Sequence, residues 1–136
     1  MGVLKNILVV DDEAGIRSLL FEVLSNEGFR VTLAKDGKDS LDQMERTRFD
    51  LLITDMDMPG LSGMELLRRM KREGRKEKVI VMSGRPLDQE DLGRDVQPVF
   101  RTLQKPFPLD NFLEVVASAL GPSKKRKGKK RVRAAA

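Results

Sequence analysis

The sequence predicts an α/β fold with a doubly wound, five-stranded parallel sheet, and two patterns support this prediction. Five short, largely apolar runs lie near 5–10, 30–34, 50–54, 78–82 and 99–104. Continuous apolar runs of this length are typical of strands that are buried on both faces. Helical patterns lie between the runs, and this alternation predicts βαβ crossovers with helices on both faces of the sheet.

The helical segments differ in how clearly the sequence marks them. Segments 16–24 and 109–120 have apolar residues at the i, i+3, i+4 and i+7 spacing of an amphipathic helix. Segments 37–46 and 63–72 have fewer apolar positions but the same spacing. Segment 87–97 contains a glycine and is flanked by prolines, so we expect only a short or mobile helix there.

The composition excludes several classes of chemistry. The chain has no cysteine and no histidine, which excludes disulfides, cysteine zinc sites and an imidazole that accepts protons or phosphoryl groups. No apolar run approaches the roughly 20 residues of a membrane span, and the N-terminus lacks the apolar stretch of a signal peptide. We expect a cytoplasmic protein with one folded domain over residues 1–121 and a disordered tail over 122–136.

Basic residues are concentrated in the tail. Segment 124–133 holds eight of the 26 Lys and Arg residues, and the other 18 face 21 acidic residues, so the domain itself is slightly acidic. A second basic cluster lies in segment 68–78. Helices of a doubly wound fold end at one edge of the sheet, so the cluster and the tail are predicted to share a face. Such a face suits nucleic-acid phosphates or another anionic surface; a solubilising tail is the alternative.

Charged and polar side chains follow the predicted strands. Asp11 and Asp12 come after the first run, Asp55 after the third, Ser83 after the fourth and Lys105 after the fifth. Parallel strands bring their carboxyl ends to one edge of a sheet, where ligands bind. We therefore expect three carboxylates, a hydroxyl and an ammonium group in one pocket. Taken singly, each has a plainer explanation, such as a helix N-terminus for the acid pair or a turn for the serine.

Four motifs stand in order at these strand ends. They are Leu8-Val9-Val10-Asp11-Asp12-Glu13, Asp55-Met56-Asp57-Met58-Pro59-Gly60, Met82-Ser83-Gly84 and Lys105-Pro106-Phe107. Together they resemble the receiver domain of bacterial two-component response regulators, over residues 5–120. The resemblance implies a flavodoxin-like (βα)5 fold with strand order 2-1-3-4-5. It also implies a stand-alone switch that a histidine kinase or a phosphorelay donor phosphorylates. The only catalytic activity it implies is removal of the protein's own phosphoryl group.

The resemblance implies a magnesium-dependent phosphoacceptor. Asp55 would be the nucleophile and would receive the phosphoryl group. Asp12 would bind Mg²⁺ directly, Asp11 mainly through water, and Asp55 and the backbone carbonyl of Asp57 would supply further oxygens. Mg²⁺ is a hard ion that prefers oxygen ligands, and it offsets the repulsion between the carboxylate and the donor.

The resemblance also implies the residues that bind the phosphoryl group. Ser83 would donate a hydrogen bond to it and Lys105 would pair with its charge, and the bond before Pro106 would be cis. Receivers usually carry an aromatic switch residue three positions before the lysine, where this chain has Thr102. We therefore expect the signal to pass through Ser83 and backbone movement of segment 84–97.

Two further positions are implied to set how fast the phosphoryl group is lost. They are Asp57 and Arg85, two residues beyond the acceptor and two beyond the hydroxyl. An ion pair between them would hinder the attacking water. Two independently solvated side chains are the alternative, because exposed pairs contribute little.

The resemblance names partners only by class. They are a histidine kinase or phosphotransfer protein, a downstream protein on the face of the fourth helix, fifth strand and fifth helix, and a second copy in a homodimer. Two other functions stay open. One is a receiver-like module that binds partners without phosphorylation. The other is a haloacid-dehalogenase-type phosphatase, suggested by Asp55-Met56-Asp57-Met58, although Met58 replaces the expected Thr or Val and the motif follows the third strand.

Overall fold

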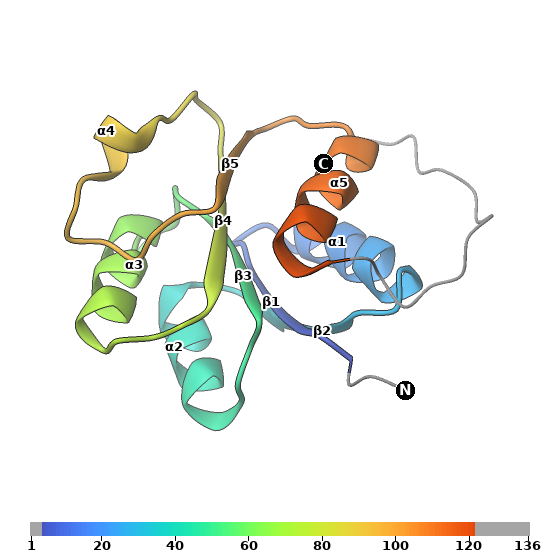
Figure 1. The fold of residues 1–136 in the computed structure, drawn as a ribbon, viewed down its shortest axis with the longest axis horizontal. Helices are drawn as coiled ribbons and strands as arrows, with labels where there is room; N and C mark the ends of the chain where they lie inside the picture. Colours follow the sequence, from blue (N-terminus) through green and yellow to red (C-terminus); the bar gives the residue numbers. More distant parts are fainter. Residues whose placement is uncertain (1–3, 122–136) are drawn as a thin grey trace.

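The fold is the predicted parallel sheet with strand order β2-β1-β3-β4-β5 (Figure 1). It was obtained as a computed structural model that describes residues 4–121. The elements are β1 (Asn6–Val10), α1 (Ala14–Asn26), β2 (Arg30–Ala34), α2 (Gly37–Arg46), β3 (Leu51–Asp55), α3 (Gly63–Arg72), β4 (Lys78–Ser83), α4 (Gln89–Leu92), β5 (Arg101–Gln104) and α5 (Leu109–Leu120). The predicted tail lies outside the described residues. No helix within 4–121 is long and apolar enough to cross a membrane.

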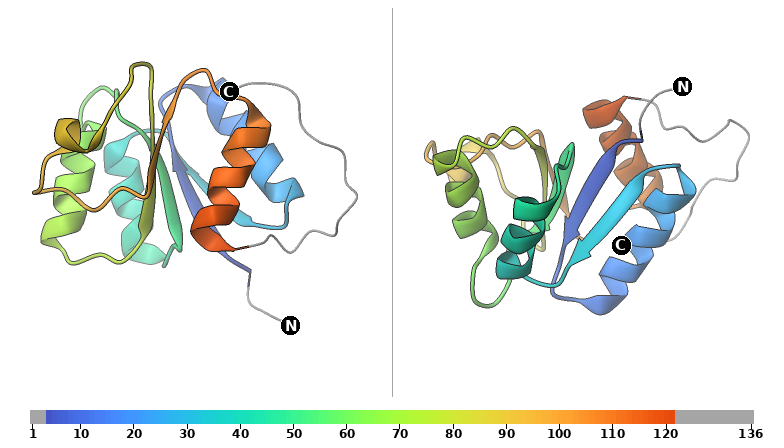
Figure 2. Two further views of the ribbon diagram at one scale, coloured as in Figure 1. Left: turned by 45° about the horizontal axis from the view of Figure 1, so that its top comes forward. Right: turned by 90° about the horizontal axis from the view of Figure 1, so that it is seen from below.

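Two cores lie on opposite faces of the sheet. Helices α1 and α5 cover one face, and α2, α3 and α4 cover the other (Figures 1 and 2). Successive side chains of a strand point to opposite faces. Thus Ile7 and Val9 pack against α1 and α5, whereas Leu8 and Val10 pack in the other core, and all four are fully buried. The continuous apolar runs are required because both faces of each central strand are covered.

Local sequence signals fix the ends of several helices. Asp36 caps α2 by accepting the backbone N–H of Asp39, and Ser62 caps α3 by accepting that of Glu65. Helix α5 ends at Gly121, which has a φ of 89°, a backbone conformation that glycine adopts without steric cost. Because every strand pair is parallel, the loops that follow β1, β3, β4 and β5 lie at one edge of the sheet.

The segment around α4 is less regular than the other crossovers. Helix α4 has only four residues, Gln89–Leu92, as the weak pattern predicts. The chain leaves it at Gly93, with a φ of 81°. Gln97 then anchors the return to the sheet: its side-chain amide donates to the carbonyls of Arg75 and Glu77. Strand β5 is shorter than the predicted 99–104 run because its pairing with β4 begins at Arg101.

Candidate functional site

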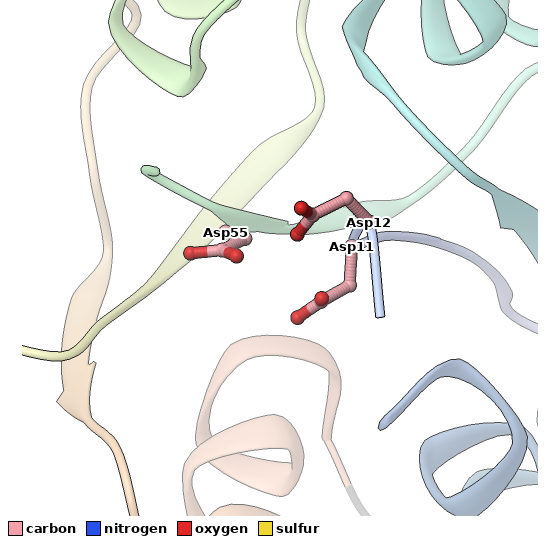
Figure 3. A group of neighbouring side chains, drawn as sticks. All are labelled: Asp11, Asp12 and Asp55. Carbon is pink, nitrogen blue, oxygen red and sulfur yellow. The ribbon is translucent and has the colours of Figure 1, made fainter. Parts of the chain in front are cut away.

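The carboxyl ends of β1 and β3 bring three carboxylates together. Asp11 and Asp12 follow β1 and Asp55 ends β3, and the three side chains lie side by side (Figure 3). Each offers an oxygen atom within 4.8 Å of the others. Asp11 is fully buried, Asp55 is 5% exposed, and Asp12 is exposed to solvent. The cluster therefore has a buried wall and one open ligand, Asp12.

Lys105, just beyond β5, supplies the positive charge of the site. Its Nζ lies 2.9 Å from Oδ2 of Asp11 and 3.4 Å from Oδ2 of Asp55. Glu13, which the sequence analysis did not assign to the site, lies 3.7 Å away. The expected pair with Asp55 is present, but the shorter contact is with Asp11. The ammonium group thus bridges the two buried carboxylates.

Backbone N–H groups hold the remaining oxygens of these two carboxylates. Asp57 N–H donates to Oδ1 of Asp55 at 3.1 Å, and Glu13 N–H donates to Oδ1 of Asp11 at 2.9 Å. With Lys105 on both Oδ2 atoms, Asp11 and Asp55 are oriented on each side. Asp12 has no such bond among the described residues, so its oxygens are the most available to a cation.

Burial and charge act together on the titration of the site. Burial raises the pKa of Asp55, and the negative charge of Asp11 adds to this, whereas the Asp57 N–H and Lys105 lower it. Burial alone would lower the pKa of Lys105, but its hydrogen bonds and charge interactions with Asp11 and Asp55 outweigh burial and raise it. Lys105 is therefore charged at neutral pH.

The raised pKa of Asp55 predicts a stability effect of Asp55→Asn. Folding favours the protonated form, so Asp55 contributes stability below the ordinary pKa of 3.8 and loses it as the pH rises through the raised value. Asp55→Asn is expected to increase the free energy of unfolding at pH 7, and to increase it less near pH 4.5. Urea unfolding in metal-free buffer measures both values. The exposed Asp57→Asn serves as the control, and an Asp55→Asn variant less stable than wild type at pH 7 would contradict this expectation.

Ser83 is placed next to Lys105 by the backbone. Ser83 ends β4 and is 2% exposed. Its carbonyl accepts the Lys105 N–H at 2.7 Å, and its Oγ accepts the Arg85 N–H at 3.2 Å. The peptide bond from Lys105 to Pro106 is cis. The hydroxyl, the ammonium and the carboxylates thus belong to one edge of the sheet, as the sequence predicts.

Comparison with known proteins decides the family. The model of the response regulator receiver domain matches residues 7–117, which include every element from β1 to most of α5. The chain belongs to the response regulator receiver domain family. Its four motifs are therefore those of a two-component signalling domain, and the acidic cluster of Asp11, Asp12 and Asp55 is consistent with the metal site of a receiver.

Relatives of this receiver domain differ in how much of them it spans. It is 36% identical over 117 residues to sporulation initiation phosphotransferase F of Bacillus subtilis and covers 94% of that protein. It is 35% identical to the transcriptional regulatory protein FixJ of Bradyrhizobium diazoefficiens and 34% identical to the response regulator MprA of Mycobacterium leprae. These matches include 85% and 87% of this chain, respectively. It spans only 56% and 52% of those two proteins.

Solved structures show the same fold. The response regulator TrrA of Thermotoga maritima, crystallised with Mg²⁺ and BeF, is 33% identical, with a TM-score of 0.76 over 86% of this chain and 100% of that one. The chemotaxis protein CheY4 of Vibrio cholerae is 25% identical, with a TM-score of 0.79 over 87% of this chain and 100% of that one.

A glycine lies directly behind the central aspartate of this receiver. A Cβ at Gly63, the first residue of α3, would lie 2.7 Å from the carbonyl oxygen of Asp55 and 2.7 Å from Cα of Met56. The backbone N–H of Gly63 donates to the Met56 carbonyl at 3.2 Å. The sequence analysis did not identify this contact, because Gly63 lies eight residues from Asp55 and follows a loop. Gly63 sets the position of the loop that follows β3.

Thr102 leaves space where receivers usually have an aromatic residue. Its Oγ1 donates to the carbonyl of Leu87 at a long 3.4 Å. A cavity of about 170 Å³ lies beside it and is lined by Ser83, Arg85 and Leu87 as well. The cavity connects the surroundings of Ser83 with the segment that leads to α4.

Asp57 and Arg85 do not form the expected ion pair. Both side chains are exposed, and no ion pair within 4.0 Å joins them among the described residues. Arg85 instead contributes its backbone N–H to Ser83. Another arginine acts at the site: Nη1 of Arg17 donates to the carbonyl of Asp11 at 2.7 Å. Arg17 lies one helical turn into α1, and no sequence signal marked it.

Proposed function

We propose that this chain is a phosphorylation-driven switch in which Asp55 accepts a phosphoryl group from a histidine kinase or a phosphotransfer protein. One observation carries the proposal: Lys105 bridges Asp11 and Asp55, at 2.9 and 3.4 Å, inside a cluster of three carboxylates. A site of this kind gathers more negative charge than one ammonium group neutralises. It therefore suits a divalent cation and an anionic phosphoryl donor.

The residues present fit Mg²⁺. Asp12, Asp55 and Asp11 would hold the ion through carboxylate oxygens, and the backbone carbonyl of Asp57 would supply a further oxygen. When bound, Mg²⁺ supplies positive charge that offsets the repulsion between the carboxylate and the donor. TrrA, which is 33% identical to this chain, was crystallised with Mg²⁺ and BeF, and this supports the assignment.

In the proposed transfer, an oxygen of Asp55 attacks phosphorus, an O–P bond forms, and the N–P bond to the donor histidine breaks. The donor imidazole leaves with the electron pair and takes up a proton. The Nζ of Lys105 lies 3.4 Å from Oδ2 of Asp55 before the transfer. After the transfer it pairs with a negatively charged phosphoryl oxygen. The Ser83 hydroxyl donates a second hydrogen bond to the phosphoryl group.

Loss of the phosphoryl group is assigned to water: a water oxygen attacks phosphorus, the O–P bond to Asp55 breaks, and the Asp55 carboxylate and inorganic phosphate are the products. Asp57, two residues beyond Asp55, and Arg85, two residues beyond Ser83, are separate, exposed side chains. Each side chain is assigned its own contact with the attacking water, because no ion pair joins the two among residues 4–121. This slow self-hydrolysis is the only turnover assigned to the chain.

The output is proposed to pass from Ser83 to segment 84–97, which contains α4, and to Thr102 on the neighbouring strand β5. In the unphosphorylated structure the Ser83 hydroxyl accepts the Arg85 N–H. In the phosphorylated state the hydroxyl turns toward the phosphoryl group and donates to it. This change moves segment 84–97, which Thr102 contacts through a hydrogen bond of 3.4 Å to the Leu87 carbonyl. The altered face of α4, β5 and α5 would bind the downstream protein or a second copy of the chain, in the cytoplasm.

Amide chemical shifts test this switch. Beryllofluoride and Mg²⁺ together are expected to shift the amides of Ser83 and residues 84–97 in the wild type, and to leave them unchanged in Asp55→Asn. Mg²⁺ alone is the matched control, expected to shift only resonances near the proposed ligands Asp11, Asp12, Asp55 and Asp57 and to leave segment 84–97 in place. If segment 84–97 keeps its free-state shifts in the beryllofluoride complex, the proposed output route is wrong.

A further inference from the structure

The amino edge of the sheet, opposite the acidic site, carries a basic face. A cavity of about 700 Å³ lies at this edge. It is lined by the basic residues Lys5, Arg48, Arg75, Lys76 and Lys78, and by the acidic residues Asp50, Glu73 and Glu77. The last turns of α2 and α3 end at the same edge and add Arg46, Arg69, Lys71 and Arg72.

The acidic groups of the cavity are already partnered. Glu77, which is buried, pairs with Arg75 at 2.8 Å, and Glu73 pairs with the same guanidinium at 3.8 Å. Asp50 accepts the backbone N–H of Asn6 at 2.8 Å. These contacts fix the three carboxylates within the protein, and the five Lys and Arg residues of the lining still outnumber them.

Three cationic side chains of the cavity lining are free to bind an external anion. Lys78 is engaged, since its Nζ donates to the carbonyl of Ala119 at 2.9 Å. Lys5, Arg48 and Lys76 are exposed and have no ion pair among the described residues. They come from three separate parts of the chain, so the fold, and not one local charge run, gathers them around the cavity.

We propose that this basic face binds the phosphodiester backbone of double-stranded nucleic acid, with Lys5, Arg48 and Lys76 contacting phosphates. Cations spread around a concave edge match the ridge of a duplex backbone. Base stacking has no support, because Phe49 in the cavity wall is buried. A bilayer is disfavoured, because a flat surface does not enter a cavity and Leu4 is the only exposed large hydrophobic residue of the described chain near this edge.

The remaining sequence reinforces the choice of a polyanion. The described chain ends at Gly121, where α5 reaches the amino edge. Residues 124–133, which follow from this point, contain eight Lys and Arg residues and no acidic residue. The described chain therefore leads into this basic segment beside the cavity, whose lining includes Ala119 and Leu120. Asp55 lies at the other end of a five-residue strand, about 17 Å away.

Salt-dependent binding tests the proposal on the full, unphosphorylated chain. The probes are a short mixed-sequence DNA duplex and the RNA duplex of the same sequence, between about 50 and 200 mM salt. Arg48→Gln with Lys76→Gln removes two charges from the face. Lys35→Gln with Lys38→Gln removes two exposed charges at the opposite edge, where α2 begins, and is the matched control. Vesicles of phosphatidylserine and phosphatidylcholine provide the membrane comparison.

The face variant is expected to lower the slope of log affinity against log salt by about 1.8 on at least one duplex, since each phosphate contact contributes about 0.9. The control variant is expected to keep the wild-type slope. The relative affinity for the two duplexes identifies the preferred nucleic acid. Equal slopes for the wild type and the face variant, no duplex binding, or binding to vesicles alone would each overturn the proposal. Because no phosphodonor is present, this outcome is independent of the proposed switch.

Discussion

Replacing Lys105 by methionine is expected to slow phosphorylation of Asp55 about 100-fold, in line with the loss of one preorganised group that stabilises developing charge. Lys105 is the only cationic side chain within 4.0 Å of Asp11 and Asp55 among the described residues. Methionine keeps the unbranched chain that packs at this position and removes the charge. The initial rate of formation of the phosphorylated species, followed by intact-mass spectrometry with acetyl phosphate and saturating Mg²⁺, gives the effect.

Lys35→Met is the matched control for this change. Lys35 also follows a strand at the carboxyl edge, but its side chain is exposed and has no ion pair among the described residues. Its rate is expected to equal that of the wild type. Circular dichroism confirms that both variants are folded before the rates are compared. A Lys105→Met variant that is phosphorylated as fast as Lys35→Met would contradict the role given to the ammonium group.

Gly63→Ala is expected to lower the free energy of unfolding by about 1–3 kcal/mol, the range of an overpacked interior position. The new Cβ would lie 2.7 Å from the Asp55 carbonyl and 2.7 Å from Cα of Met56, and both neighbours are backbone atoms that cannot rotate away. The strand end must shift, so the phosphorylation rate is expected to fall as well. Urea unfolding and the initial rate measure the two effects.

Gly15→Ala provides the opposite expectation in the same protein. Gly15 lies in α1, and a Cβ there would meet nothing within 4 Å. Alanine is favoured over glycine inside a helix by roughly 0.5–1 kcal/mol, so this variant is expected to be more stable than the wild type. If Gly63→Ala behaved like Gly15→Ala, α3 would not be packed against the end of β3 as described.

The sheet and the core of the site were predictable because each depends on a local signal. The apolar runs mark strands buried on both faces, and the residue after each run lies at the carboxyl edge once the strands are parallel. Asp55, Ser83 and Lys105 were therefore brought together by the predicted topology. The tertiary contacts of the site depend on side-chain reach, which periodicity does not encode.

Three contacts show what such signals leave out. Arg17 reaches the Asp11 carbonyl from within α1, and Gly63 supports Asp55 across a loop. Lys105 approaches Asp11 more closely than Asp55, which no spacing rule predicts. Similarly, Arg85 is available by sequence to pair with Asp57, but the loop directs its backbone N–H to Ser83 and leaves the side chain exposed.

The most direct test of the central claim is intact-mass spectrometry after incubation with acetyl phosphate, with and without Mg²⁺. The wild type is expected to gain a single phosphoryl group only when Mg²⁺ is present, and Asp57→Asn is expected to do the same. Asp55→Asn is expected to gain none. A phosphoryl group that still appears in Asp55→Asn, or a wild type that stays unmodified even with a phosphorylated histidine kinase as donor, would contradict the assignment of Asp55 as the phosphoacceptor.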